Sequence, residues 1–340
     1  MKPRAFATVF LLLPVFALFD MQSSSPSRGT WTVNYACENQ VNVQADFRTA
    51  HSEHSNSMEV SRSAIKPAQG QNAVQFAVTR AAGTFKFTGT LAGDEGSGQV
   101  EFTANQQFPQ QMAEVGYSGL SFDDVFRMAM MDVTPQFARD LNEAGLANLS
   151  TEQLIRMKIH GADAEFVRAI AQAGLKVTDP ELLIRLRIHE VSPDFVQRIR
   201  LAGYDGLGAE DLIRFRIHEV TPEFVQQMKQ LGYDKLAAED LIRFKIHDVT
   251  PEFVESMKKL GFGNLAAEDL VRMKIHDVTP DFAAKVKQLG YNDVGAEDLI
   301  RLRIHDVSPE YIAQAKSYDR DISLDEVIQH KIRGDRVSQM

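Results

Sequence analysis

Apolar and polar residues alternate along the chain from about residue 29 to residue 108. Apolar side chains take every second position in five runs, at residues 31–35, 41–47, 74–78, 85–87 and 100–102. A period of two is typical of strands that bury one face. We therefore expect five or six antiparallel strands in a small sheet with one buried face.

Two segments interrupt this alternation. Residues 92–98 contain Gly93, Gly96 and Gly98, whose freedom to adopt positive φ predicts a hairpin turn between the last two runs. Residues 49–57 are rich in serine and histidine and predict an exposed loop. His51 and His54 lie three residues apart in this loop. They could bind a metal, but a solvated polar loop is the favoured interpretation because no further ligand is evident.

Farther along, the chain repeats a unit of 29 residues. An Ile-His pair recurs at this interval, with its histidine at His160, His189, His218, His247, His276 and His305. One step earlier Met131 takes the histidine position, and a half unit at residues 323–336 ends the series. Units without insertions or deletions should share one shape, which is the mark of a solenoid.

The second half of each unit predicts a helix of about ten residues. In the unit that starts at Leu236, Thr250 is a good N-cap and Pro251 suits the first helical position. Gly261 suits the left-handed position just after the helix, and Phe262 supplies the apolar residue that follows a Schellman ending.

The first half of the unit allows two interpretations. Ile242, Phe244 and Ile246 alternate with polar residues, as in the strand of a leucine-rich repeat. The helix-like opening at residues 237–240, the capping box at residues 150–153 and Gly161 after His160 favour a helix instead. As a helix, this segment places Leu241, Ile242, Ile246 and Val249 on one apolar arc, and Lys245 must snorkel out of it.

The expected fold class is α+β. Residues 1–28 form an N-terminal segment, residues 29–110 a small antiparallel β-sheet domain, and residues 111–340 an α-solenoid of about seven helical hairpins with a half-repeat as its C-terminal cap.

The N-terminal segment predicts export. Lys2 and Arg4 precede an apolar run at residues 5–19, which is short for a membrane span but suits the core of a signal peptide. We therefore expect a periplasmic or secreted protein, with an uncleaved inner-membrane anchor as the alternative. The single cysteine, Cys37, would then be unpaired in an oxidising compartment, which is tolerable if it is buried.

Charged residues recur in register with the repeat. A possible interaction ladder pairs an arginine and a histidine in five successive units: Arg185 and His189, Arg214 and His218, Arg243 and His247, Arg272 and His276, Arg301 and His305. Glu239 and Arg243 are spaced for an i, i+4 ion pair, and most other copies have an acid at the same offset. The histidines fall where a helix C-terminus is expected, so a structural cap is favoured over a metal ligand.

Recognised catalytic motifs are incomplete or missing. His189-Glu190 and His218-Glu219 begin like a zinc-protease motif, but Pro193 and Pro222 stand where its second histidine would be. No phosphate-binding loop or nucleophile elbow is evident, and we expect no catalytic residue, cofactor or metal. The formal net charge of −9 also argues against a binder that tracks nucleic-acid phosphates.

The repeat Val-Thr-Pro-Glu-Phe-Val…Leu-Gly-Tyr, with Ala-Gly-Thr-Phe-Lys-Phe-Thr-Gly before the array, resembles repeats of uncharacterised bacterial envelope proteins. It also resembles tails on membrane metallopeptidases of the beta-lactam-sensor type. The resemblance covers most of residues 80–315 and implies no catalytic residues, because the peptidase motif is absent. A weaker similarity is to the longer DNA-reading repeats of plant-pathogen effectors.

These features together predict a non-enzymatic exported scaffold or adaptor that binds another protein, expected to be an envelope protein, through its helical repeats. The alternatives are a nucleic-acid-binding repeat protein and an enzyme with its site in the β-domain.

Export predicts a shortened chain. We expect cleavage between Phe19 and Arg28, which mass spectrometry of the mature protein would detect as a new N-terminus. An intact Met1 in the cytoplasmic fraction would contradict this prediction.

Overall fold

The computed structural model describes residues 27–48, 53–263 and 265–334. Residues 1–26 of the predicted N-terminal segment and His51 lie outside these residues. The chain divides into two compact parts, residues 1–138 and 139–340. The predicted domain limits at residues 28 and 110 stay predictions.

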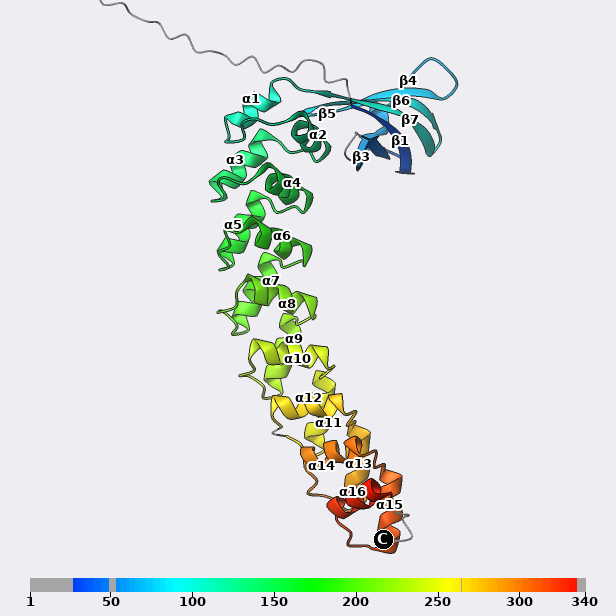
Figure 1. The fold of residues 1–340 in the computed structure, drawn as a ribbon, viewed down its shortest axis with the longest axis vertical. Coiled ribbons are helices and arrows are strands. Elements are labelled where there is room, and N and C mark those ends of the chain that lie inside the picture. Colours follow the sequence, from blue (N-terminus) through cyan, green and yellow to red (C-terminus); the bar gives the residue numbers. More distant parts are fainter. Residues whose placement is uncertain (1–26, 49–52, 264, 335–340) are drawn as a thin grey trace, which may run out of the picture. The chain divides into compact units, whose positions relative to one another are not determined.

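The part that spans residues 1–138 contains one antiparallel sheet (Figure 1). Its strand order is β3-β2-β1-β7-β6-β5-β4. The strands are β1 (Ser27–Ala36), β2 (Gln40–Arg48), β3 (Glu53–Ser61), β4 (Lys66–Pro67), β5 (Ala73–Arg80), β6 (Gly83–Ala92) and β7 (Glu95–Ala104). A short 3-10 helix, η1 (Arg62–Ala64), follows β3. The alternating runs therefore form a sheet as predicted, with more strands than expected.

The extra full-length strand corrects the loop prediction. Residues 53–57 lie in β3 and pair with β2 along their whole length. The alternation is hidden there because two inward positions are polar: His54 and Asn56 are only partly buried, whereas Met58 and Val60 are buried. The predicted hairpin turn is confirmed but tighter, since only Gly93 and Asp94 separate β6 from β7.

The sheet curls around its own aromatic core. Phe47 on β2 and Phe85 on β6 are separated by two strands in the sheet, yet their ring centroids are 5.9 Å apart. The Trp31 indole donates a hydrogen bond to the Thr88 carbonyl at 3.1 Å. Gly98 makes room for this indole, because a Cβ there would lie 2.7 Å from its Nε1. Glycine and tryptophan together allow the strong curvature.

Helices follow the sheet at regular spacing. Each 29-residue unit has two, and we call the one that comes first in the unit its first-layer helix and the other its second-layer helix. The first-layer helices, one per unit, are α2 (Phe122–Met130), α4 (Thr151–Ile159), α6 (Pro180–Ile188), α8 (Ala209–Ile217), α10 (Ala238–Ile246), α12 (Ala267–Ile275), α14 (Ala296–Ile304) and α16 (Leu324–Arg333). The second-layer helices are α3 (Pro135–Glu143), α5 (Ala164–Gln172), α7 (Pro193–Leu201), α9 (Pro222–Gln230), α11 (Pro251–Lys259), α13 (Pro280–Gln288) and α15 (Pro309–Tyr318). The short α1 (Phe108–Ala113) precedes them.

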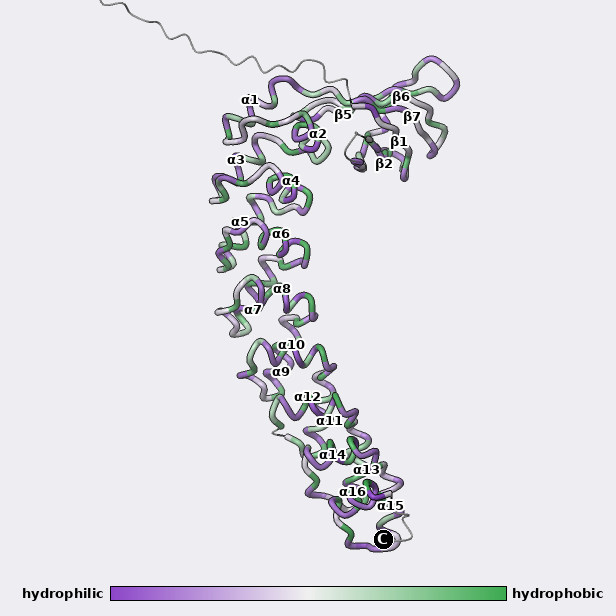
Figure 2. The backbone as a smooth tube through the Cα atoms, in the orientation of Figure 1, coloured by the Kyte–Doolittle hydropathy of each residue, from purple (hydrophilic) through white to green (hydrophobic). Residues whose placement is uncertain are grey.

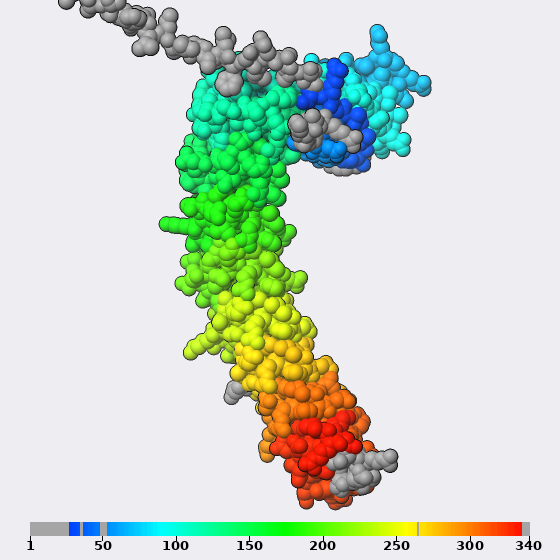
Figure 3. Space-filling view, viewed as in Figure 1, coloured from blue at the N-terminus to red at the C-terminus, as the bar shows by residue number. Residues whose placement is uncertain are grey.

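Within residues 139–340, each helix packs on the helix two places farther along the chain. Successive hairpins therefore stack in chain order as a solenoid-like array, and Figure 3 shows their colours following one another in sequence. Both apolar and polar stretches occur throughout the helical array (Figure 2). The predicted helical array is thus confirmed, and the strand interpretation of residues 242–246 is wrong.

The helix ends follow the local sequence. The Thr250 hydroxyl accepts the Phe253 N–H at 3.2 Å, and Pro251 occupies the first helical position of α11. Gly261 has φ of +94°, and the Phe262 N–H donates to the Met257 carbonyl at 3.0 Å, which completes the Schellman ending. The capping box at Ser150 and Gln153 also forms.

One residue of the predicted apolar arc is misplaced. Leu241, Ile242 and Val249 are buried, but Ile246 is 54% exposed and Phe244 is fully buried instead. The methionines at positions 128, 157 and 273 are buried at the Phe244 position, as expected for core residues.

Gly261 offers a test of the unit boundaries. Gly261→Val should lower the free energy of unfolding by about 1–2 kcal/mol, because an L-residue is strained at positive φ. Gly261→Asn should cost clearly less, since asparagine tolerates left-handed backbone. Urea denaturation of both variants measures the difference. Equal losses for valine and asparagine would contradict a left-handed conformation at this position.

Candidate functional site

The arginines of the predicted ladder lie in the first-layer helices and form ion pairs between units. The Arg243 guanidinium lies 2.7 Å from the Glu268 carboxylate at the start of the next first-layer helix, and Arg272 lies 2.6 Å from Glu297. The same pairing joins Arg156 to Glu181, Arg185 to Glu210, Arg214 to Glu239 and Arg301 to Asp325.

This geometry corrects the predicted pairing within one helix. Glu239 pairs with Arg214 of the preceding unit at 2.7 Å, not with Arg243 four residues later. The stacked helices bring the neighbouring acid directly to the guanidinium, whose fork can hold a carboxylate with two hydrogen bonds. The Arg272 pair has this two-bond form. The hydrogen bond from Arg243 holds the pKa of Glu268 below its usual value.

The six histidines are the C-cap residues of the first-layer helices, as their spacing predicted. Each is partly buried. The carbonyls of His160, His189 and His276 accept hydrogen bonds from an arginine of the next unit, so a neighbouring side chain supplies the cation at these helix ends. Within the described residues, no group of three or more His, Cys, Asp or Glu side chains is placed to hold a metal ion.

A second ladder lies at the turn between the two helices of each hairpin. The residue after each C-cap has φ near +55° and is acidic in most units, as at Glu219 and Asp248. Lys274 lies 3.0 Å from Asp248, and its ammonium lies 5.2 Å from the centre of the Phe253 ring. Arg216, Lys245 and Arg303 occupy equivalent positions. Lys245 therefore snorkels, as predicted. In the α4–α5 hairpin this turn position is Gly161, which carries no charge.

A row of exposed isoleucines accompanies the two ladders. The last residue of six first-layer helices is an isoleucine that is about half exposed: Ile159, Ile188, Ile217, Ile246, Ile275 and Ile304. Each lies directly before its histidine and three residues after the ladder arginine. Sequence reasoning missed this isoleucine row because helical periodicity assigned these side chains to the buried face, although their invariant place in the repeat was visible.

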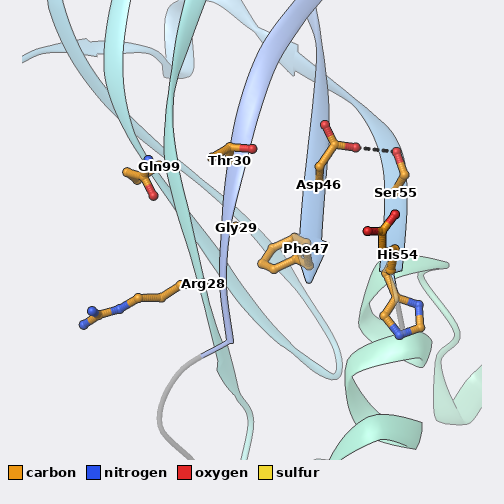
Figure 4. A pocket seen from close by; sticks show the side chains of 9 residues that line it. Arg28, Gly29, Thr30, Asp46, Phe47, His54, Ser55 and Gln99 are labelled. Carbon is orange, nitrogen blue, oxygen red and sulfur yellow. Dashed lines mark hydrogen bonds between the residues drawn. The ribbon is translucent and has the colours of Figure 1, made fainter. Parts of the chain in front are cut away.

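The sheet carries a hollow of about 700 Å³. Its lining includes Arg28, Asp46, His54, Ser55 and Gln99 (Figure 4). The Ser55 hydroxyl donates to Asp46 at 2.6 Å, whereas the His54 ring packs edge-on against Phe126 at 5.4 Å and lies 3.6 Å from Asp123. Arg28 points away from the Asp46–Ser55 pair (Figure 4). These polar groups do not converge on one point, as an acid-base site requires.

Cys37 lies in the turn between β1 and β2 and is exposed, contrary to the burial that would make an unpaired thiol tolerable. Among the described residues, none of the helices combines the length and the apolar character that a membrane crossing needs.

No protein-family model matches the chain, and no curated protein matches it. The architecture is a series of regular helical repeats of about 29 residues after a β-domain.

The ion pairs between units predict a pH-dependent contribution to stability. The pKa values of Glu268 and Glu297 are lowered by their arginine partners, so their contribution is full above the unfolded pKa of about 4.3 and is lost as pH falls through the lower folded value. We expect Glu268→Gln with Glu297→Gln to destabilise the protein at pH 7, and the deficit to shrink progressively as the pH falls below the unfolded pKa. Urea denaturation across this range measures it.

The control replaces two exposed loop acids, Asp205→Asn with Asp234→Asn. For this pair, we expect a smaller deficit at pH 7. A deficit for the glutamine variant that persists unchanged at low pH would mean that the lost side-chain packing, not the ion pairs, is responsible.

Proposed function

We propose that the protein is a non-enzymatic scaffold that binds another protein through the face of its first-layer helices that carries the isoleucine row. The observation that carries the proposal is the isoleucine row beside the arginine and histidine ladder, repeated in successive units. Surface apolar residues scattered singly are ordinary, whereas here a half-exposed isoleucine recurs at the same position of six successive units. Solenoid arrays commonly use such extended faces for binding.

The state of the ladder cations favours a protein over a nucleic acid. Arg185, Arg214, Arg243, Arg272 and Arg301 are each paired with a carboxylate of the next unit, so these charges are already compensated. From residue 116 onward, 29 basic and 37 acidic residues give 29 − 37 = −8. A surface of this kind repels a polyanion and suits apolar or cationic groups.

We also propose that the scaffold acts outside the cytoplasm, in the cell envelope. The apolar run at residues 5–19 and the resemblance of the repeat to envelope proteins and to metallopeptidase tails support this location. Export of the chain would place the array where an envelope protein can reach it.

A photoreactive amino acid tests the proposal in cells that express the chain. Placed at His247, which directly follows Ile246 of the row, it should give an ultraviolet-dependent adduct that protease degrades and nuclease does not. Placed at Leu201, an exposed residue of the second layer, it should give no adduct of the same size. No adduct at position 247, or an adduct that nuclease removes, would contradict protein binding, and the latter would support the nucleic-acid alternative.

A further inference from the structure

Each isoleucine of the row offers a partner two groups at one place, its side chain and its backbone carbonyl. Its side chain is about half exposed. In addition, no hydrogen bond to its backbone carbonyl occurs among the described residues, although the next residues donate to the carbonyls of the preceding turn. This carbonyl lies at a helix C-terminus, where the helix dipole concentrates negative charge. The row is therefore a series of apolar side chains, each beside a free hydrogen-bond acceptor.

The first hairpin shows what covers this position. Met130 ends α2 and stands 29 residues before Ile159, so it is the equivalent residue. Unlike the isoleucines, Met130 is only 1% exposed. Its carbonyl accepts hydrogen bonds from the Arg80 guanidinium and the Asn56 amide of the sheet, and Arg80 also donates to the Ala129 carbonyl at 2.7 Å.

From this internal precedent, we propose that the isoleucine row binds a basic amphipathic polypeptide segment. Apolar side chains of the segment pack on the isoleucines, and its arginines donate to the free carbonyls as Arg80 does on α2. The inference rests on the proposed function and names the chemistry of the partner.

Charge at the row agrees with a cationic occupant. An acidic residue stands two positions after the isoleucine in five of the six units, and its side chain is highly exposed, as for Glu219 at 84% and Asp248 at 78%. Each of these carboxylates faces a lysine or arginine of the next unit, as Asp248 faces Lys274 at 3.0 Å, so their charges are compensated. The negative end of the helix dipole at the isoleucine carbonyls is therefore the charge that favours a cationic group over an acidic one.

The spacing of the units sets the period of the partner. Helices that pack side by side are about 8–10 Å apart, so successive isoleucines should recur at about this distance. Seven residues of an α-helix rise about 10.5 Å. A helical segment with one apolar and one basic residue per seven positions matches the row over several units.

A synthetic peptide of four heptads tests the inference, with leucine at the first position, arginine at the fourth, and alanine and glutamine elsewhere. Fluorescence anisotropy with the full-length protein at about 0.1 M salt measures its binding. We expect saturable binding, and binding weaker by roughly ten-fold or more when glutamate replaces every arginine.

Two protein variants locate the binding surface. Ile217→Ser, Ile246→Ser and Ile275→Ser together should weaken binding of the arginine peptide by roughly ten-fold or more. Leu201→Ser removes an exposed leucine from the second layer and should leave affinity within about two-fold of wild type. Thermal unfolding checks the fold of the triple variant, and Ile246→Ser alone replaces it if the fold is lost.

The outcomes separate this inference from the proposed function. No binding of the arginine peptide, equal binding of the two peptides, or equal binding by wild type and the serine variant overturns the basic-segment inference. If a protein adduct still forms at position 247 in that case, the scaffold function stands and its partner has another chemistry. If the arginine peptide does not bind and no protein adduct forms at position 247, both proposals fail.

Discussion

The short helices of this protein cannot satisfy their own backbones. Most have nine residues, and an α-helix leaves four N–H and four carbonyl groups without partners inside it. Serine, threonine and aspartate caps provide acceptors at many N-termini. At the C-termini the donors come from the next unit: Arg216 donates to the His189 carbonyl and Lys258 to the Leu231 carbonyl. A hairpin therefore needs its neighbour for hydrogen bonds as well as for apolar contact, which explains a strict repeat without insertions.

The sheet meets the same requirement for the first hairpin. Phe126 of α2 packs among the rings of Phe47, Phe85 and Phe102, and Arg80 donates to the last carbonyls of the helix. Burial lowers the pKa of Arg80, but arginine remains charged under ordinary conditions. A β-domain thus provides the apolar surface and the cation that another helical unit provides elsewhere. The two halves of the fold follow one rule, although their secondary structures differ.

Sequence reasoning succeeded where the signal is local and failed where it depends on a neighbour. Thr250, Pro251 and Gly261 define the ends of α11 through their own backbone preferences, so these ends were predictable. Ile246 was assigned to the core because helical periodicity indicates which face a side chain lies on. It does not indicate how far the adjacent helix extends over that face.

The candidate surface shows the same division. The regular positions of the arginines and histidines could be counted, but the partners of the arginines could not. Arg243 has an acid at a suitable distance in its own helix, and only the stacking shows that Glu268 of the next unit is the one it contacts. Polar His54 and Asn56 hid β3 for a similar reason, since their inward positions contact α2 rather than a strand-lined core.

Gly161 makes one junction of the array unlike the others. Where later units place a carboxylate, this glycine leaves Arg187 to donate to the His160 carbonyl and to lie over the Phe166 ring, 4.8 Å from its centre. Because unit stabilities in a solenoid add through nearest-neighbour contacts, unequal junctions divide an array into segments that separate at different loads. Dissolved salt screens an exposed ion pair more than it affects a cation held over a ring. At low ionic strength the junction at Gly161 therefore differs most from the others, because it lacks one of their ion pairs, and at high ionic strength the difference narrows.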